Sequence, residues 1–111
     1  METRDGFEIP FLFPDGETET DAINIEQGCF GTLIVPTGSD LIGKDLQFVA
    51  VPKTAGKFAE TALLSTPITL VAGANPLSAD AIREVGAIQL CRLSVDIAVS
   101  GDCDLVLLWK S

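Results

Sequence analysis

Residues 88–110, IQLCRLSVDIAVSGDCDLVLLWK, carry the clearest structural signal in the chain. Large apolar residues occupy the odd positions from 93 to 99, and the even positions from 92 to 98 hold Arg92, Ser94, Asp96 and Ala98. This two-residue period is typical of a half-buried β-strand over Ile88–Val99. The turn-forming residues 100–102 (SGD) then lead into a second apolar run over residues 103–110. We therefore expect residues 88–110 to form a β-hairpin.

The same pattern of short strands divided by turns extends back toward the N-terminus. Further strands are expected over residues 18–25, 30–35, 45–51, 58–64 and 67–72, several of them stopped by Pro or Gly. One short helix is expected over residues 77–85, with Ser78 as its N-cap. Seven or eight short strands, separated by turn residues about every 8–12 positions, predict an all-β fold. We expect a β-sandwich or jelly roll, with a closed barrel as the alternative.

Composition limits the function classes that are open to the chain. Its 111 residues form one domain at most, and 47% of them are hydrophobic. The net charge of −9 gives the wrong electrostatic sign for binding nucleic acid or an anionic membrane. Histidine is absent, which removes the commonest general base and metal ligand, so we expect neither an enzyme nor a bound cofactor. The longest apolar run, residues 105–109, is too short for a membrane helix.

The three cysteines and the first residues bear on where the protein is made. Cys29, Cys91 and Cys103 form no C-x-x-C pair, and we interpret them as reduced, buried side chains. Residues 1–5 carry mixed charge and no apolar segment of the signal-peptide kind follows. These features predict synthesis in the cytoplasm without a signal peptide.

The beginning of the chain differs from the rest in charge. Residues 1–26 hold eight acidic side chains against the single Arg4. We expect residues 1–16 to form an extended acidic arm or edge strand, because Pro10 interrupts its apolar pattern, and residues 17–111 to form the β-sandwich. The arm places its large apolar side chains at alternate positions, and these must be covered by the domain or by a neighbouring chain. They are candidate interface residues: Phe7, Ile9, Phe11 and Phe13.

Two further residues are candidates for the same interface. Trp109, at the end of the last expected strand, is a core residue or an interface anchor. Arg92, on the polar side of the clearest strand, is either solvated or ion-paired. A sharper possibility for Arg92 is an ion pair with the acidic segment of a second subunit.

Two short motifs in the chain resemble ligand-binding sites. Residues 38–44 (GSDLIGK) match the phosphate-loop pattern, but Asp45 replaces the Ser or Thr that would hold magnesium, so we interpret them as an inter-strand loop. Glu17, Glu19 and Asp21 fall on one side of an extended segment, where oxygen ligands could hold calcium. A solvated acidic surface is the commoner meaning of such a cluster, and these three residues are weak calcium candidates only.

From Ile23 onward the order of features resembles a family of small phage-encoded, virion-associated β-sandwich proteins. The matching pieces are residues 22–25 (AINI), the turn at Gly28, 32–36 (TLIVP), 46–48 (LQF), 90–93 (LCRL) and 105–108 (LVLL). The resemblance implies an accessory structural protein of the virion that decorates or cements the capsid, or a tail or neck component. Closed symmetric self-association, with a trimer favoured and a dimer as the alternative, would bury the apolar arm. The expected partner is a major capsid protein or another virion protein. A carbohydrate-binding β-sandwich is the alternative from a different functional class.

Overall fold

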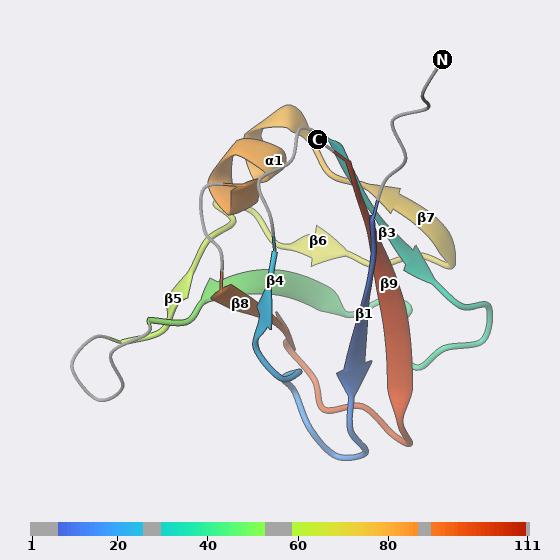
Figure 1. Cartoon of the computed structure of the whole chain (residues 1–111). Helices are drawn as coiled ribbons and strands as arrows, with labels where there is room; N and C mark the ends of the chain where they lie inside the picture. The colour runs from blue at the N-terminus through green and yellow to red at the C-terminus, as the bar shows by residue number, and fades with distance from the viewer. Residues whose placement is uncertain (1–6, 26–29, 53–58, 87–89, 111) are drawn as a thin grey trace.

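The computed structural model describes residues 7–25, 30–52, 59–86 and 90–110. Within these ranges the chain forms nine β-strands and one short helix (Figure 1). The strands make two antiparallel sheets that enclose one hydrophobic core between them, so the prediction of an all-β, sandwich-like fold is confirmed.

The first sheet, called here the β1 sheet, has the order β1-β9-β3-β7. Its strands are β1 (Phe7–Phe13), β9 (Cys103–Lys110), β3 (Phe30–Val35) and β7 (Gly73–Pro76). The sequence patterns predict three of these strands. They do not predict β7, because a four-residue segment that begins with Gly and ends with Pro looks like a turn.

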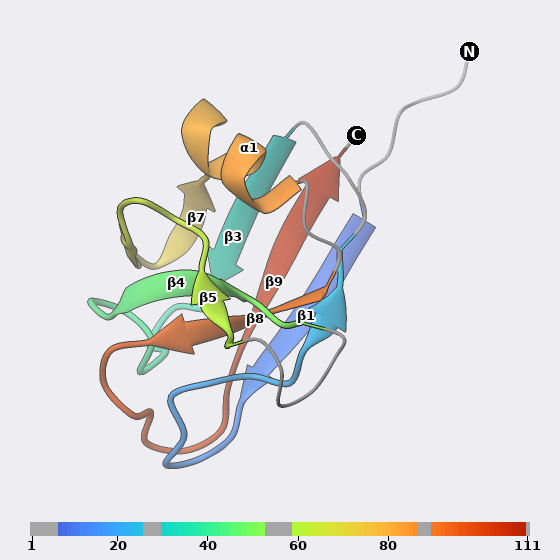
Figure 2. The same cartoon turned by 90° about the vertical axis from the view of Figure 1, so that its left-hand side faces the viewer.

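The second sheet, called here the β8 sheet, has the order β2-β8-β4-β5, and β6 also pairs with β4. Its strands are β2 (Ile23–Asn24), β8 (Leu90–Val95), β4 (Asp45–Ala50), β5 (Thr61–Ala62) and β6 (Ile68–Thr69). Figure 2 shows β8 and β4 running across the direction of β9, so the two sheets cross rather than align.

The core is built from the inward-facing residues of both sheets. Along β8, buried Cys91, Leu93 and Val95 alternate with half-buried residues, as the two-residue period requires. The β1 sheet contributes the largest buried side chain, Trp109, which packs against Gly31 of β3. A Cβ atom on Gly31 would lie 2.6 Å from the Trp109 ring, so the indole fits only because residue 31 has no side chain.

The helix α1 (Ala79–Gly86) lies at one end of the sandwich, near the end of β9 (Figure 2). Its start confirms the expected cap, because the Ala81 backbone N–H donates to Ser78 Oγ at 3.1 Å. Ala81 and Val85, four residues apart on one side of α1, are both buried in the core. The helix therefore closes this end of the core.

The expected hairpin over residues 88–110 is wrong. β8 pairs with β2 and β4, whereas β9 pairs with β1 and β3 in the other sheet. The strand ends at Val95 because Asp96 turns the chain: its carboxylate accepts the Asp45 N–H at 3.0 Å, and its own N–H donates to the Asp45 carbonyl. Ile97 is consequently 61% exposed instead of continuing the inward row.

The expected division between an arm and a domain is also wrong. Residues 7–13 pair along their whole length with β9, from Phe7 opposite Trp109 to Phe13 opposite Cys103. Phe11 and Phe13 are 1% and 0% exposed, and both belong to the core. β1 is thus an edge strand of the sandwich itself, which agrees with the presence of Pro10 within it.

Candidate functional site

The outer face of the β1 sheet is apolar, although it points away from the core. In an antiparallel sheet with one buried face, the other face normally carries polar side chains. Here the side chains that alternate with the buried ones are mostly apolar as well. The described side chains on this face are Glu8, Pro10, Leu12, Thr32, Ile34, Ala74, Pro76, Asp104, Val106 and Leu108, of which Glu8, Thr32 and Asp104 are polar.

The register of the strands aligns these side chains in rows. Pro10 lies opposite Val106, Val106 opposite Ile34, and Ile34 opposite Ala74. One apolar row therefore crosses all four strands, since cross-strand partners stand side by side on the same face. The neighbouring row contains Leu108, which lies between Glu8 and Thr32.

The side chains of this face are accessible to a partner. Leu12 is 50% exposed and Leu108 is 39% exposed, which places both among the most exposed large apolar residues in the described part of the chain. Pro10, Ala74 and Pro76 are exposed too, while Val106 and Ile34 in the centre are half-buried by their neighbours. An apolar surface that joins four strands and remains open to solvent is a candidate site of protein association.

The outer face of the β8 sheet has the opposite character. Its central residue is Arg92, whose Nε lies 3.1 Å from Glu60 Oε1 in an ion pair and whose Nη1 lies 3.9 Å from Glu19 Oε1. Gln47 uses its amide to accept from the Leu64 N–H and to donate to the Leu64 carbonyl. The polar groups of this face are therefore engaged within the chain, and only the β1 sheet presents an apolar outer face among the described strands.

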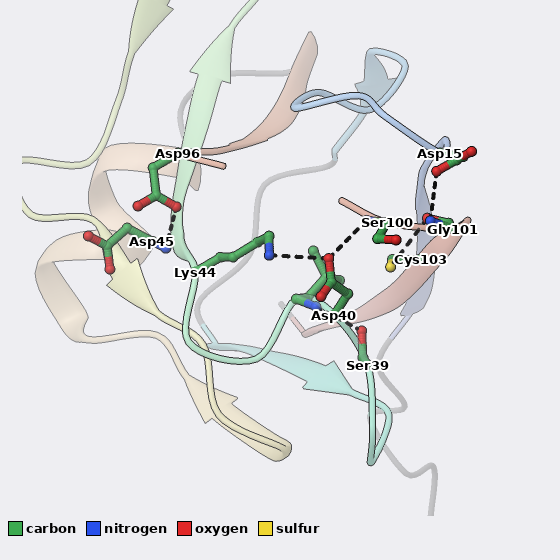
Figure 3. A network of polar contacts seen from close by, with 10 residues as sticks. Asp15, Ser39, Asp40, Lys44, Asp45, Asp96, Ser100, Gly101 and Cys103 are labelled. Carbon is green, nitrogen blue, oxygen red and sulfur yellow. Dashed lines mark hydrogen bonds and ion pairs between the residues drawn. The ribbon is translucent and has the colours of Figure 1, made fainter. Parts of the chain in front are cut away.

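Acidic groups lie at the end of the apolar face where Asp104 stands. Asp104 also lines an open hollow of about 280 Å³ between the β3–β4 and β8–β9 connections, whose charged lining residues are Asp40, Asp102 and Asp104. The Ser100 N–H donates to Asp40 Oδ2 at 2.9 Å, and Lys44 lies 3.3 Å from the same oxygen (Figure 3). The Ser100 hydrogen bond first, and the Lys44 contact second, hold the pKa of Asp40 below its ordinary value.

A second aspartate fixes the neighbouring turn. Asp15 Oδ1 accepts the Gly101 N–H at 2.7 Å (Figure 3). The Asp15 N–H donates to Asp102 Oδ1 at 3.0 Å. These bonds attach the turn after β1 to the connection between β8 and β9. The acidic end of the outer face is thus held by several local contacts.

The structure corrects most of the interface residues that the sequence suggests. Phe11, Phe13 and Trp109 are buried in the core of their own domain, so they are not available to a partner. Ile9 is half-buried and packs against the same core. The side chain of Phe7 lies outside the described residues. The physical reason is that β1 carries apolar residues on both faces, and Phe11 and Phe13 occupy the inner one.

Arg92 does contact the acidic segment, but within its own chain. Its partners are Glu19 and Glu60, and its Nη1 also donates to the Thr20 carbonyl at 3.4 Å. Within the described residues, the acidic partners of Arg92 therefore belong to its own chain. Its role in the described part of the chain is to attach the segments that carry Glu19 and Glu60 to the centre of β8.

The weak calcium candidates do not converge on a metal site. Among the described residues, no three Cys, Asp or Glu side chains are placed to hold a metal ion. Glu17, Glu19 and Asp21 are all described, and Glu19 faces Arg92 instead. The phosphate-loop match at residues 38–44 lies between β3 and β4 as a series of turns, in agreement with its interpretation as an inter-strand loop.

Of the three cysteines, two lie in the described residues. Cys91 and Cys103 are both buried and unbonded to other cysteines, as the sequence predicts. Burial raises the pKa of the Cys91 thiol to about 12, which keeps this thiol protonated. Cys29 lies outside the described residues.

A signal for the outer face does exist in the sequence. Residues 105–108 (LVLL) are apolar without alternation, and Pro10 and Leu12 separate the phenylalanines in β1. Strands that are apolar on both faces are expected to be covered on both faces. The pattern therefore indicates a second covered surface, but only the strand order shows that these residues form one continuous patch.

No helix in the described part of the chain is long and apolar enough to cross a membrane. Comparison with protein-family models, with curated proteins and with solved structures finds no match for this chain.

Proposed function

We propose that this chain is a phage structural protein that docks on a protein shell and decorates or cements it. The observation that carries the proposal is the apolar outer face of the β1 sheet, centred on Val106 and Ile34. Covering such a face releases water from apolar groups, and this is the main driving force of protein association. The sequence resemblance to small virion-associated β-sandwich proteins supports the same class of function.

The proposed docking surface differs from the row of phenylalanines that the sequence suggests. Pro10 and Leu12 of β1 contact the shell, while Phe11 and Phe13 hold β1 in the domain. Self-association, with a trimer favoured, remains part of the proposal as an arrangement of copies around a symmetry axis of the shell. Binding of this kind stabilises the shell by mass action.

The proposal is tested by quantitative mass spectrometry of virions purified from infected cells. We expect the chain in a fixed, high copy number relative to the major capsid protein, since a decoration protein follows the symmetry of the shell. If the chain is found in infected cells and is missing from purified virions, the proposed function is wrong.

A further inference from the structure

We propose that the outer face of the β1 sheet binds a protein surface that is apolar at its centre and basic at its border. This inference rests on the proposed docking function and names the chemistry of the partner. It is carried by the charges around the face together with the apolar row at its centre.

The charged side chains that the structure describes on and beside this face are all acidic apart from Lys44; the side chain of Lys110, at the end of β9, lies outside the described residues. Glu8 and Asp104 stand on the face, and Asp102 and Asp40 line the adjoining hollow. Lys44 contacts Asp40 at 3.3 Å, which leaves Glu8, Asp104 and Asp102 without a described basic partner. Lysine or arginine side chains on a partner would meet these carboxylates and would speed and orient association.

A second copy of this chain fits the face less well. It would bring the same acidic groups to the contact, and each copy carries a net charge of −9. The charge of the face therefore favours a basic partner over a homodimer through this face.

The partner is expected on the face of the sheet and not at its edges. β1 and β7 are the two edge strands, and each contains a proline, Pro10 and Pro76. Proline has no backbone N–H, so each edge strand lacks one hydrogen-bond donor. An added strand would need that donor for its main-chain hydrogen bonds. The contact is therefore made by side chains, with Val106 and Ile34 at its centre.

Two synthetic β-hairpins test this chemistry. Both present the same valine and isoleucine face, and they differ only in having lysine or glutamate along its border. Binding to the isotope-labelled full chain is followed by the methyl shifts of Val106, Ile34 and Leu12 in NMR spectra. We expect the lysine-bordered hairpin to bind at least about tenfold more tightly, and salt to reduce the difference.

Matched variants locate the site. Val106→Asp and the more exposed Leu12→Asp should each abolish binding, whereas Val49→Asp, at a half-buried valine on the opposite sheet, should not. Asp104→Asn should reduce the preference for lysine, and Asp21→Asn, the same change away from the face, should leave it intact. Because Leu12 is half exposed, Leu12→Asp reports on binding even if Val106→Asp disturbs folding.

Three results would overturn the inference. The first is equal affinity for the two hairpins. The second is a set of NMR shifts confined to residues outside the outer face. The third is a dimer of the wild-type chain in sedimentation experiments that the Val106→Asp substitution dissociates. The last result would assign the face to a second copy. None of them depends on finding the chain in virions, so failure of the partner chemistry is distinguishable from failure of the proposed function.

Discussion

At the scale of single residues, a few side chains with unusual surroundings fix the geometry of the β1 sheet. Asn75 is buried in β7, where its amide accepts from the Val71 N–H and donates to the carbonyls of Leu33 and Val71. Gly31 in the adjacent strand allows the Trp109 ring to lie against the backbone. Neither role follows fully from the sequence, because Leu33, which accepts from Asn75, and Trp109, which lies against Gly31, are both distant along the chain.

Replacing Gly31 by Ala is expected to destabilise the domain by about 1–3 kcal/mol, because the added methyl group overlaps the Trp109 ring. Urea unfolding followed by circular dichroism measures this change. The penalty should be smaller in a Trp109→Leu background, since the two sites are coupled. An equal penalty in both backgrounds would show that the Trp109 contact is not its cause.

Asp40 gives the stability of the domain an acid-dependent component. Its pKa lies below the ordinary value of 3.8, so its contribution is present above that pH and is lost as the pH falls through the folded pKa. Wild-type protein should therefore exceed Asp40→Asn in stability at neutral pH, with the gap closing below about pH 4. Urea unfolding over a pH series measures the gap. A gap that stays constant with pH would contradict a role for the Asp40 charge.

At the scale of elements, the sequence predicts most strands but not their partners. Apolar periodicity, apolar runs and turn or cap residues are local signals, and they correctly indicate β3, β4, β8, β9 and α1 within a few residues. Pairing depends on contacts between distant segments, which is why the hairpin expected over residues 88–110 is absent. The turn at Asp96, made by mutual hydrogen bonds with Asp45, sends the chain from one sheet to the other.

β1 illustrates how an element can serve two surfaces. Phe11→Ala should cost about 3–5 kcal/mol, because it empties a site in the core. Leu12→Ala, the next residue along the strand, should change stability by less than about 1 kcal/mol, since its side chain is half exposed. Thermal and urea unfolding of the two variants compare the costs directly. Similar costs for both would mean that β1 does not present Phe11 inward.

Removal of the whole strand gives a stronger form of the same comparison. A free arm could be deleted without harm to the domain, but deletion of residues 2–16 removes Phe11 and Phe13 from the core. We expect the shortened chain to lose its cooperative unfolding transition. If the shortened chain folds and has the circular dichroism spectrum of the wild type, residues 1–16 are an arm separate from the domain.

At the scale of the whole molecule, the outer faces of the two sheets differ in chemical character. The β8 sheet satisfies its own polar groups through Arg92 and Gln47, and the β1 sheet leaves an apolar row open. The sequence predicts the sandwich because its strands are short and frequent, and its composition predicts a role in protein contacts. The sequence pattern suggests the phenylalanines of β1 as the contact residues. It cannot do better, because alternation alone does not tell which face of a strand is buried by the rest of its own chain.

The most direct test of the docking claim is a cryo-electron microscopy reconstruction of purified virions. We predict that a shell protein contacts Val106 and Ile34 and places lysine or arginine side chains beside Asp104. A chain that is bound through the β8 sheet, with the outer face of the β1 sheet turned toward solvent, would contradict the account.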